Sequence, residues 1–182
     1  FAIEMTNRGW ILRNEIIWHK PNCMPSSVKD RFTIDFEKVF FFVKSKKYYF
    51  KQQLEPMKEE SALRYKYAFG GEKNTHIKET DNPTYVVGDR IPTNLRNKRA
   101  IWTISTRPYS GSHFAVFPLD LIAPMIDSGC PPGGTVLDPF CGSGTVLEYA
   151  RKHGLNGIGI ELNPNYEKLV AERALLNTLP LN

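Results

Sequence analysis

Two carboxylates and a glycine-rich turn form the part of this sequence best suited to chemistry. Asp138 follows a short apolar run, and a Cys-Gly-Ser-Gly turn comes next at residues 141–144. A second apolar run, beginning at residue 157, ends at Glu161, about twenty residues beyond the first. Glycines after a strand let the backbone approach a ligand closely, and an acid at this spacing can bind the hydroxyls of a ribose. The pattern therefore predicts half of a nucleoside-binding site.

Such a site needs two strands and the helix that joins them. The residue types predict strands at 135–137 and 157–161, with a helix at 145–152 between them. Further helices are predicted at residues 118–128 and from Pro164 to near Asn177. The alternative for both carboxylates is that they cap strand ends without binding a ligand.

The turn also distinguishes between two kinds of nucleoside. Dinucleotide sites have a third glycine, but Val146 and Leu147 follow Gly144 here. Asp138 lies just before the turn, where its charge would repel a pyrophosphate and attract the ammonium group of a methionine moiety. These residues favour S-adenosylmethionine over NAD.

The two runs DPFCGSGT, from Asp138, and GIELNPNY, from Gly159, resemble the S-adenosylmethionine-binding half of DNA amino-methyltransferases. Those enzymes methylate N6 of adenine or N4 of cytosine. The resemblance implies an α/β, Rossmann-like fold, incomplete in this chain, with an irregular inserted recognition region. It also implies a set of cofactor-binding residues: His113, Phe114, Asp138, Phe140, Cys141, Gly142, Ser143, Gly144, Thr145, Glu161 and Leu162.

A second segment resembles the target-base pocket of the same enzymes. Residues 10–20 and 36–44 are rich in branched and aromatic side chains, which predicts two strands that form a hairpin at a sheet edge. Trp18, Lys20 and Asn22 offer the flat apolar surface and the hydrogen-bonding groups that a flipped base requires. For Trp18, packing in the core of the sheet is an equally weighted alternative.

Residues 48–107 are polar, basic and aromatic, without sustained periodicity, and lie where the family places its target-recognition region. The resemblance therefore divides the chain into a base-pocket part (1–50), a recognition insertion (51–107) and a cofactor-binding half (108–182). Double-stranded DNA is the expected partner. The candidates for DNA contact are basic residues: Lys46, Lys47, Arg90, Arg96, Lys98 and Arg99. The alternative is that these charges are simply solvated.

The family's catalytic tetrapeptide, Asp/Ser-Pro-Pro-Tyr/Phe, does not occur in this sequence. We expect it upstream of Phe1. The missing central strand should come from residues upstream of Phe1, from a separate chain or from a swapped neighbour, which leaves a homodimer open. The strand before Asp138 should then have an unpaired edge, and the 182 residues alone should be inactive. Methylation of cytosine C5 is disfavoured because no cysteine follows a proline, and no Cys/His spacing suits zinc.

Composition sets the remaining bounds. Lys and Arg total 24 against 19 for Asp and Glu, so the charge permits a polyanionic partner. Three widely spaced cysteines and the lack of a signal peptide or membrane span indicate the cytoplasm of a prokaryotic cell or its phage. Together the sequence predicts a DNA amino-methyltransferase of restriction–modification type. The alternatives are a non-catalytic DNA- or cofactor-binding subunit and a nucleotide-dependent oxidoreductase.

Overall fold

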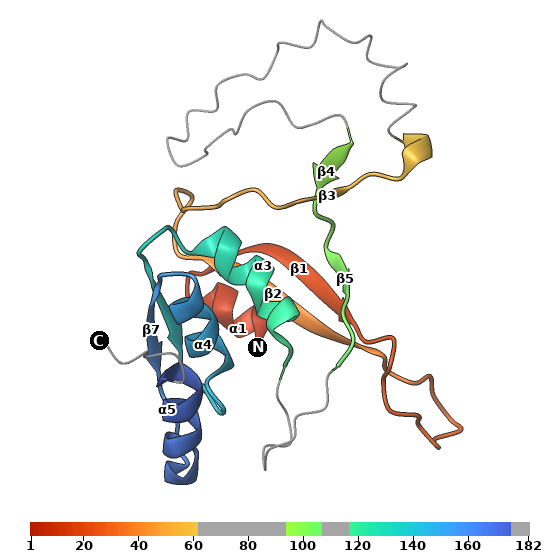
Figure 1. The fold of residues 1–182 in the computed structure, drawn as a ribbon. Helices are drawn as coiled ribbons and strands as arrows, with labels where there is room; N and C mark the ends of the chain where they lie inside the picture. Colours follow the sequence, from red (N-terminus) through yellow and green to blue (C-terminus); the bar gives the residue numbers. More distant parts are fainter. Residues whose placement is uncertain (62–93, 107–116, 176–182) are drawn as a thin grey trace, which may run out of the picture. The chain divides into compact units, whose positions relative to one another are not determined.

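The computed structural model describes residues 1–61, 94–106 and 117–175, which are coloured in Figure 1. Contacts along the chain divide it into two compact units. The first comprises Phe1–Glu15 and Phe40–Ala100, and the second comprises Ile16–Val39 and Ile101–Asn182. We describe each unit by itself.

The first unit contains α1 (Ala2–Asn7) and a short antiparallel pair, β3 (Leu54–Pro56) with β4 (Leu95–Asn97). Gly9, with φ 86°, lies just after α1, where its left-handed conformation ends the helix. A second feature is the stacking of the Phe41 ring on Phe50, with ring centroids 5.7 Å apart.

The predicted hairpin strands are confirmed as β1 (Ile11–His19) and β2 (Phe36–Val43), and both continue from one unit into the other. They belong to a three-stranded sheet in the order β2-β1-β5, so β2 is an edge strand. The third strand, β5 (Ile101–Thr103), runs parallel to β1.

Regular structure within residues 48–107 corrects one expectation, because β3, β4 and β5 all lie there. Strand β5 forms since its central side chain, Trp102, is buried beside its register partner Trp18. Both indoles pack with Leu121 of α3 (Leu119–Gly129). Three residues are too few to show periodicity, which explains why the sequence did not reveal these strands.

The cofactor half contains β6 (Thr135–Asp138), α4 (Thr145–Lys152) and β7 (Asn156–Gly159), as the sequence predicts. The two strands pair in parallel, which requires the crossover that α4 supplies (Figure 1). Leu147 of α4 lies against β7 so closely that a Cβ on Gly159 would come within 2.7 Å of its Cδ1. The opposite side of α4 packs on α3 through a buried cluster: Ile122, Ile126, Val146 and Tyr149.

Strand β6 has a second edge that pairs with no other strand among the described residues. This agrees with the expectation of an unpaired edge beside Asp138. The sheet face opposite α4 is also open, since the register partners Leu137 and Ile158 are 58% and 53% exposed.

The chain continues into a 3-10 turn (Pro164–Tyr166) and then α5 (Glu167–Leu175). The helix predicted from Pro164 is therefore present, although its predicted end near Asn177 lies outside the described residues. No helix in the described part of the chain is long and apolar enough to cross a membrane. The same residues contain no group of three metal-ligating side chains.

Candidate functional site

The carboxyl ends of β6 and β7 bring the two predicted carboxylates to the same edge of the sheet. Asp138 is the register partner of Gly159, and Glu161 follows two residues later. Backbone bonds extend this pairing: the Ile160 amide donates to the Asp138 carbonyl at 2.9 Å, and the Cys141 amide donates to the Ile160 carbonyl at 2.9 Å. The glycine turn is thus bonded directly to the end of β7.

The Glu161 carboxylate accepts hydrogen bonds from two backbone amides, one of them in the glycine turn. Its Oε2 accepts a hydrogen bond from the Gly142 amide at 2.8 Å. Its Oε1 accepts one from the Asn163 amide at 2.9 Å. The acid at the end of the second strand therefore fixes the loop that follows the first.

Two glycines in the turn are required by backbone conformation. Gly142 and Gly144 have φ of 50° and 80°, in the left-handed region that favours glycine. Gly144 also caps α4, and a Cβ on it would lie 3.3 Å from Val170 Cγ1 of α5. The close approach that Gly144 permits is thus to a helix of the same chain.

The rim of this edge carries exposed apolar side chains. Phe140 is 87% exposed and Leu162 is 97% exposed. Asp138 fixes the start of the turn, because its Oδ1 accepts a hydrogen bond from the Phe140 amide at 3.1 Å. The rim combines carboxylates with apolar surface, a pairing suited to a nucleoside with a positively charged substituent.

Beneath the rim, Cys141, Ser143 and Thr145 are buried, with Ser143 and Thr145 only 3% exposed. Burial raises the pKa of the Cys141 thiol, and the negative charges of Asp138 and Glu161 raise it further. The two carboxylates therefore create a negative electrostatic potential at the Cys141 thiol. Such a potential favours a cationic ligand and opposes a pyrophosphate. Contact of these three side chains with a cofactor stays a prediction.

The predicted base-pocket residues lie together at the end of β1, each with a partner. Trp18 is 6% exposed, and its Nε1 donates to the Ile104 carbonyl at 2.8 Å, which places it in the core. Lys20 Nζ lies 5.3 Å from the Trp18 ring and pairs with Glu37 at 2.7 Å. Asn22 binds the backbone of Thr106 through both its amide nitrogen and its oxygen, each at 2.9 Å. A contact with a base stays a prediction for all three.

Four of the six candidate DNA-binding residues fall into two groups. Lys46 and Lys47 are exposed in the turn after β2. Arg96 and Arg99 instead both donate from Nε to the same oxygen of Glu55, at 2.9 Å each. Burial acts to raise the Glu55 pKa, but the hydrogen bonds from Arg99 and Arg96 outweigh it, and the pKa lies below its ordinary value. Three predicted residues, Arg90, His113 and Phe114, lie outside the described residues.

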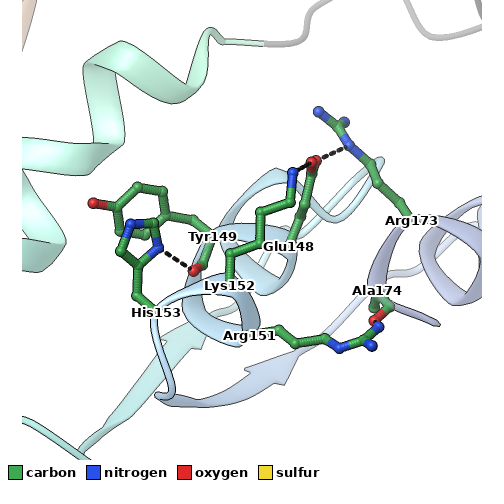
Figure 2. A network of polar contacts seen from close by, with 7 residues as sticks. All are labelled: Glu148, Tyr149, Arg151, Lys152, His153, Arg173 and Ala174. Atoms are coloured by element: carbon green, nitrogen blue, oxygen red, sulfur yellow. Dashed lines mark hydrogen bonds and ion pairs between the residues drawn. The ribbon is translucent and has the colours of Figure 1, made fainter. Parts of the chain in front are cut away.

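One polar network beside the turn was not predicted from sequence (Figure 2). Glu148 of α4 accepts from Lys152 Nζ and from Arg173 Nε, both at 2.6 Å. Arg173 also donates from a terminal nitrogen to the hydroxyl of Ser143 at 2.6 Å. The Glu148–Lys152 spacing of four residues is readable on a helix, whereas the contact of Arg173 depends on how α5 packs.

The family model described as DNA methylase, for N6 and N4 methyltransferases, matches residues 1–172. The chain belongs to this family. The match spans β1, β2 and residues 135–161 in one alignment, so the family resemblance predicted from sequence is confirmed.

Similar curated proteins are Type II methyltransferases. M.XycI of Xanthomonas campestris pv. cyanopsidis is 39% identical over 94% of this chain and 47% of its own length. M.SmaI of Serratia marcescens is 39% identical over 96% of this chain and 50% of its own length. The chain thus spans about half the length of the curated relatives it matches.

Solved structures confirm the predicted fold. The cytosine-N4-specific PvuII DNA methyltransferase superposes with a TM-score of 0.63 at 20% identity, over 98% of this chain and 56% of that one. The complex of M1.HpyAVI with SAM gives 0.61 at 24% identity, over 97% of this chain and 67% of that one. The fold is therefore the Rossmann-like α/β fold of DNA methyltransferases.

Proposed function

We propose that these 182 residues are the cofactor-binding and base-pocket part of a DNA amino-methyltransferase of a restriction–modification system. The substrate is double-stranded DNA, methylated at the exocyclic amine of adenine (N6) or cytosine (N4). The observation that carries the proposal is the placement of Asp138 and Glu161 on either side of the glycine turn, at adjacent ends of paired parallel strands.

The residues present fit S-adenosylmethionine. This cofactor supplies a methyl group on a positively charged sulfur, and it also carries an ammonium group. The pKa of Cys141 is raised first by burial and then by the negative charges of Asp138 and Glu161, and those two charges are favourable for both positive groups of the cofactor. In the proposal, Asp138 binds the ammonium end and Glu161 accepts from the ribose hydroxyls. Phe140 and Leu162, exposed at the rim, offer apolar surface to the rest of the nucleoside.

Glu161 can fill this role although it already accepts two backbone hydrogen bonds. Each carboxylate oxygen accepts one of these bonds from a backbone amide, and a carboxylate oxygen can accept more than one, so the ribose hydroxyls can share the same oxygens. Those amides also fix the orientation of the carboxylate, which lowers the entropic cost of binding.

The remaining parts of the proposal concern DNA and the rest of the fold. We assign DNA contact to residues 51–107 and to the exposed Lys46 and Lys47. We place the protein in the cytoplasm. The catalytic tetrapeptide and its strand come from a segment outside residues 1–182 or from a partner chain that contains it. The second edge of β6, which pairs with no strand among the described residues, supports this assignment, because a strand edge without a partner leaves backbone N–H and C=O groups unpaired.

Calorimetric titration with S-adenosylmethionine and with NAD tests the cofactor. We expect heat of binding with S-adenosylmethionine and none with NAD. Binding of NAD without a response to S-adenosylmethionine would favour the oxidoreductase alternative instead. A non-catalytic subunit would bind cofactor or DNA yet transfer no methyl group even when the rest of the fold is supplied.

A further inference from the structure

The last helix of the described chain contacts the glycine turn through two neighbouring residues. Val170 packs on Gly144, where even a Cβ would meet its Cγ1 at 3.3 Å. Arg173, one helical turn further along α5, donates to the Ser143 hydroxyl at 2.6 Å. Helix α5 therefore contacts two consecutive residues of the turn, and the residue before them, Gly142, donates its amide to Glu161.

Arg173 is itself held in place by Glu148. Figure 2 shows the Glu148 carboxylate between Arg173 and Lys152, with both cations bonded to it. The side chains of Arg173 and Glu148 are only 18% and 16% exposed, whereas that of Lys152 is 48% exposed. Burial acts to raise the Glu148 pKa, but the hydrogen bonds from Lys152 and Arg173 outweigh it and lower the pKa. Glu148 thus remains a carboxylate near neutral pH and fixes the guanidinium.

The two hydrogen bonds of Arg173 depend on the planar guanidinium group. One nitrogen, Nε, donates to Glu148, and a terminal nitrogen donates to Ser143. A planar guanidinium can serve two acceptors in fixed directions, and a lysine ammonium cannot reproduce that arrangement. A second tie, from the Arg151 guanidinium to the Ala174 carbonyl, holds the last turn of α5 against α4.

We infer that Arg173 is a positioning residue for cofactor binding: with Glu148 as its anchor, it holds Ser143 and so sets the conformation of the glycine turn. Ser143, 3% exposed, lies between Gly142, which Glu161 binds, and Gly144, which caps α4. A shift of the Ser143 hydroxyl would displace both neighbours. The inference rests on the proposed function, because it assigns a role in binding the cofactor proposed for this turn.

The test measures affinity for S-adenosylmethionine in the full chain by calorimetry. Arg173→Met keeps the aliphatic stem and removes the guanidinium, with its hydrogen bonds to Glu148 and Ser143, and we expect it to weaken binding about tenfold or more. Lys152→Met is the matched control. It removes a cation from the same carboxylate without touching the turn, and it should change affinity by no more than about twofold. Arg173→Lys, which keeps the charge, should restore only part of the loss.

A second comparison separates positioning from a general loss of stability. Ser143→Ala should also weaken binding. The double variant that combines Ser143→Ala with Arg173→Met should bind no more weakly than Arg173→Met alone, because each single change already removes the hydrogen bond between these two side chains. Titrations are run well below each variant's unfolding temperature, so the fitted stoichiometry reports the folded fraction. Wild-type affinity in Arg173→Met, equal losses in Lys152→Met, or losses that multiply in the double variant would overturn the inference.

A ligand-free measurement distinguishes failure of this inference from failure of the proposed function. Hydrogen exchange of the amides in residues 141–144 should be faster in Arg173→Met than in wild type, while exchange in α3 is unchanged. If the wild-type chain does not bind S-adenosylmethionine, the proposed function fails. The exchange comparison still decides whether Arg173 holds the turn. Unchanged exchange of the amides of residues 141–144 in Arg173→Met would show that it does not.

Discussion

The backbone amide of Gly142 donates to the carboxylate of Glu161 at 2.8 Å, and this bond joins the two halves of the candidate site. It links the turn after β6 to the residue that follows β7, so neither can move alone. The acid proposed to bind the ribose therefore also holds the backbone of the glycine turn.

Replacing Glu161 should consequently cost more than a single ligand contact. We expect Glu161→Ala to lower the affinity for S-adenosylmethionine by about 1–3 kcal/mol, since it leaves the ribose hydroxyls and the Gly142 amide without an acceptor. Glu161→Gln keeps one acceptor oxygen and should lose less. Calorimetry measures both, with the exposed Glu167→Ala as the charge-matched control. Wild-type affinity in Glu161→Ala would remove this residue from the site.

The raised pKa of Cys141 predicts a characteristic pH profile for alkylation. Because the protonated thiol is unreactive, labelling of Cys141 by iodoacetamide should require a higher pH than labelling of an ordinary cysteine. Asp138→Asn removes one of the negative charges that raise this pKa and should move the profile to lower pH. Peptide mapping by mass spectrometry gives the midpoint for each thiol.

Cys130 serves as the internal control for that experiment. Its pKa is also raised, but by burial alone, so Asp138→Asn should leave its profile unchanged. Equal shifts at Cys130 and Cys141 would indicate a general loosening of the protein, and no shift at Cys141 would contradict the negative potential at the turn.

Tyr149 should make stability depend on alkaline pH. Burial is the larger cause, and the hydrogen bond to Asp127 at 2.8 Å is the second cause, of a Tyr149 pKa that is raised from 10 to about 12. The phenol is thus ionised more easily in the unfolded chain, so its contribution is complete below about pH 10 and is lost as pH rises to about 12. Over that range the free energy of unfolding should fall by roughly 2–3 kcal/mol more in wild type than in Tyr149→Phe. Chemical denaturation at several pH values measures the difference, and parallel curves would contradict it.

The two groups of basic residues should respond differently to neutralisation. If Lys46 and Lys47 contact phosphates, changing both to Gln should reduce the slope of log affinity against log salt by about 0.9 per contact. Arg96→Ala should instead destabilise the β3–β4 pair, because Glu55 loses one of its two guanidinium partners. Mobility-shift titrations at several salt concentrations measure the slope, with the exposed Lys168→Gln as control. An unchanged slope in the double variant would mean that these lysines are only solvated.

The 182 residues alone should bind cofactor but transfer no methyl group. The sequence has no Asp/Ser-Pro-Pro-Tyr/Phe tetrapeptide, and β6 lacks a second neighbour among the described residues. A radiolabelled methyl-transfer assay on DNA tests this. Robust activity of the purified chain without a partner would show that other residues perform the catalytic step.

The sequence by itself determined the elements whose signals are local. The apolar run before Asp138, the glycine turn and the run before Glu161 predict β6, the loop and β7 because strand composition and glycine conformation act over a few residues. The same local signals identified the β1 and β2 strands and α3. The family followed from these motifs, and the match over residues 1–172 confirmed it.

Only the tertiary structure decided which partners the polar and aromatic side chains have. Trp18 had two equally weighted roles in the sequence, and the pairing of β1 with β5 buries it beside Trp102. Arg96 turns to Glu55, and Arg173 reaches Ser143, thirty positions away in the chain. Such contacts depend on how separate helices and strands pack together. The residues next to a side chain in the sequence do not indicate which distant residues it will contact.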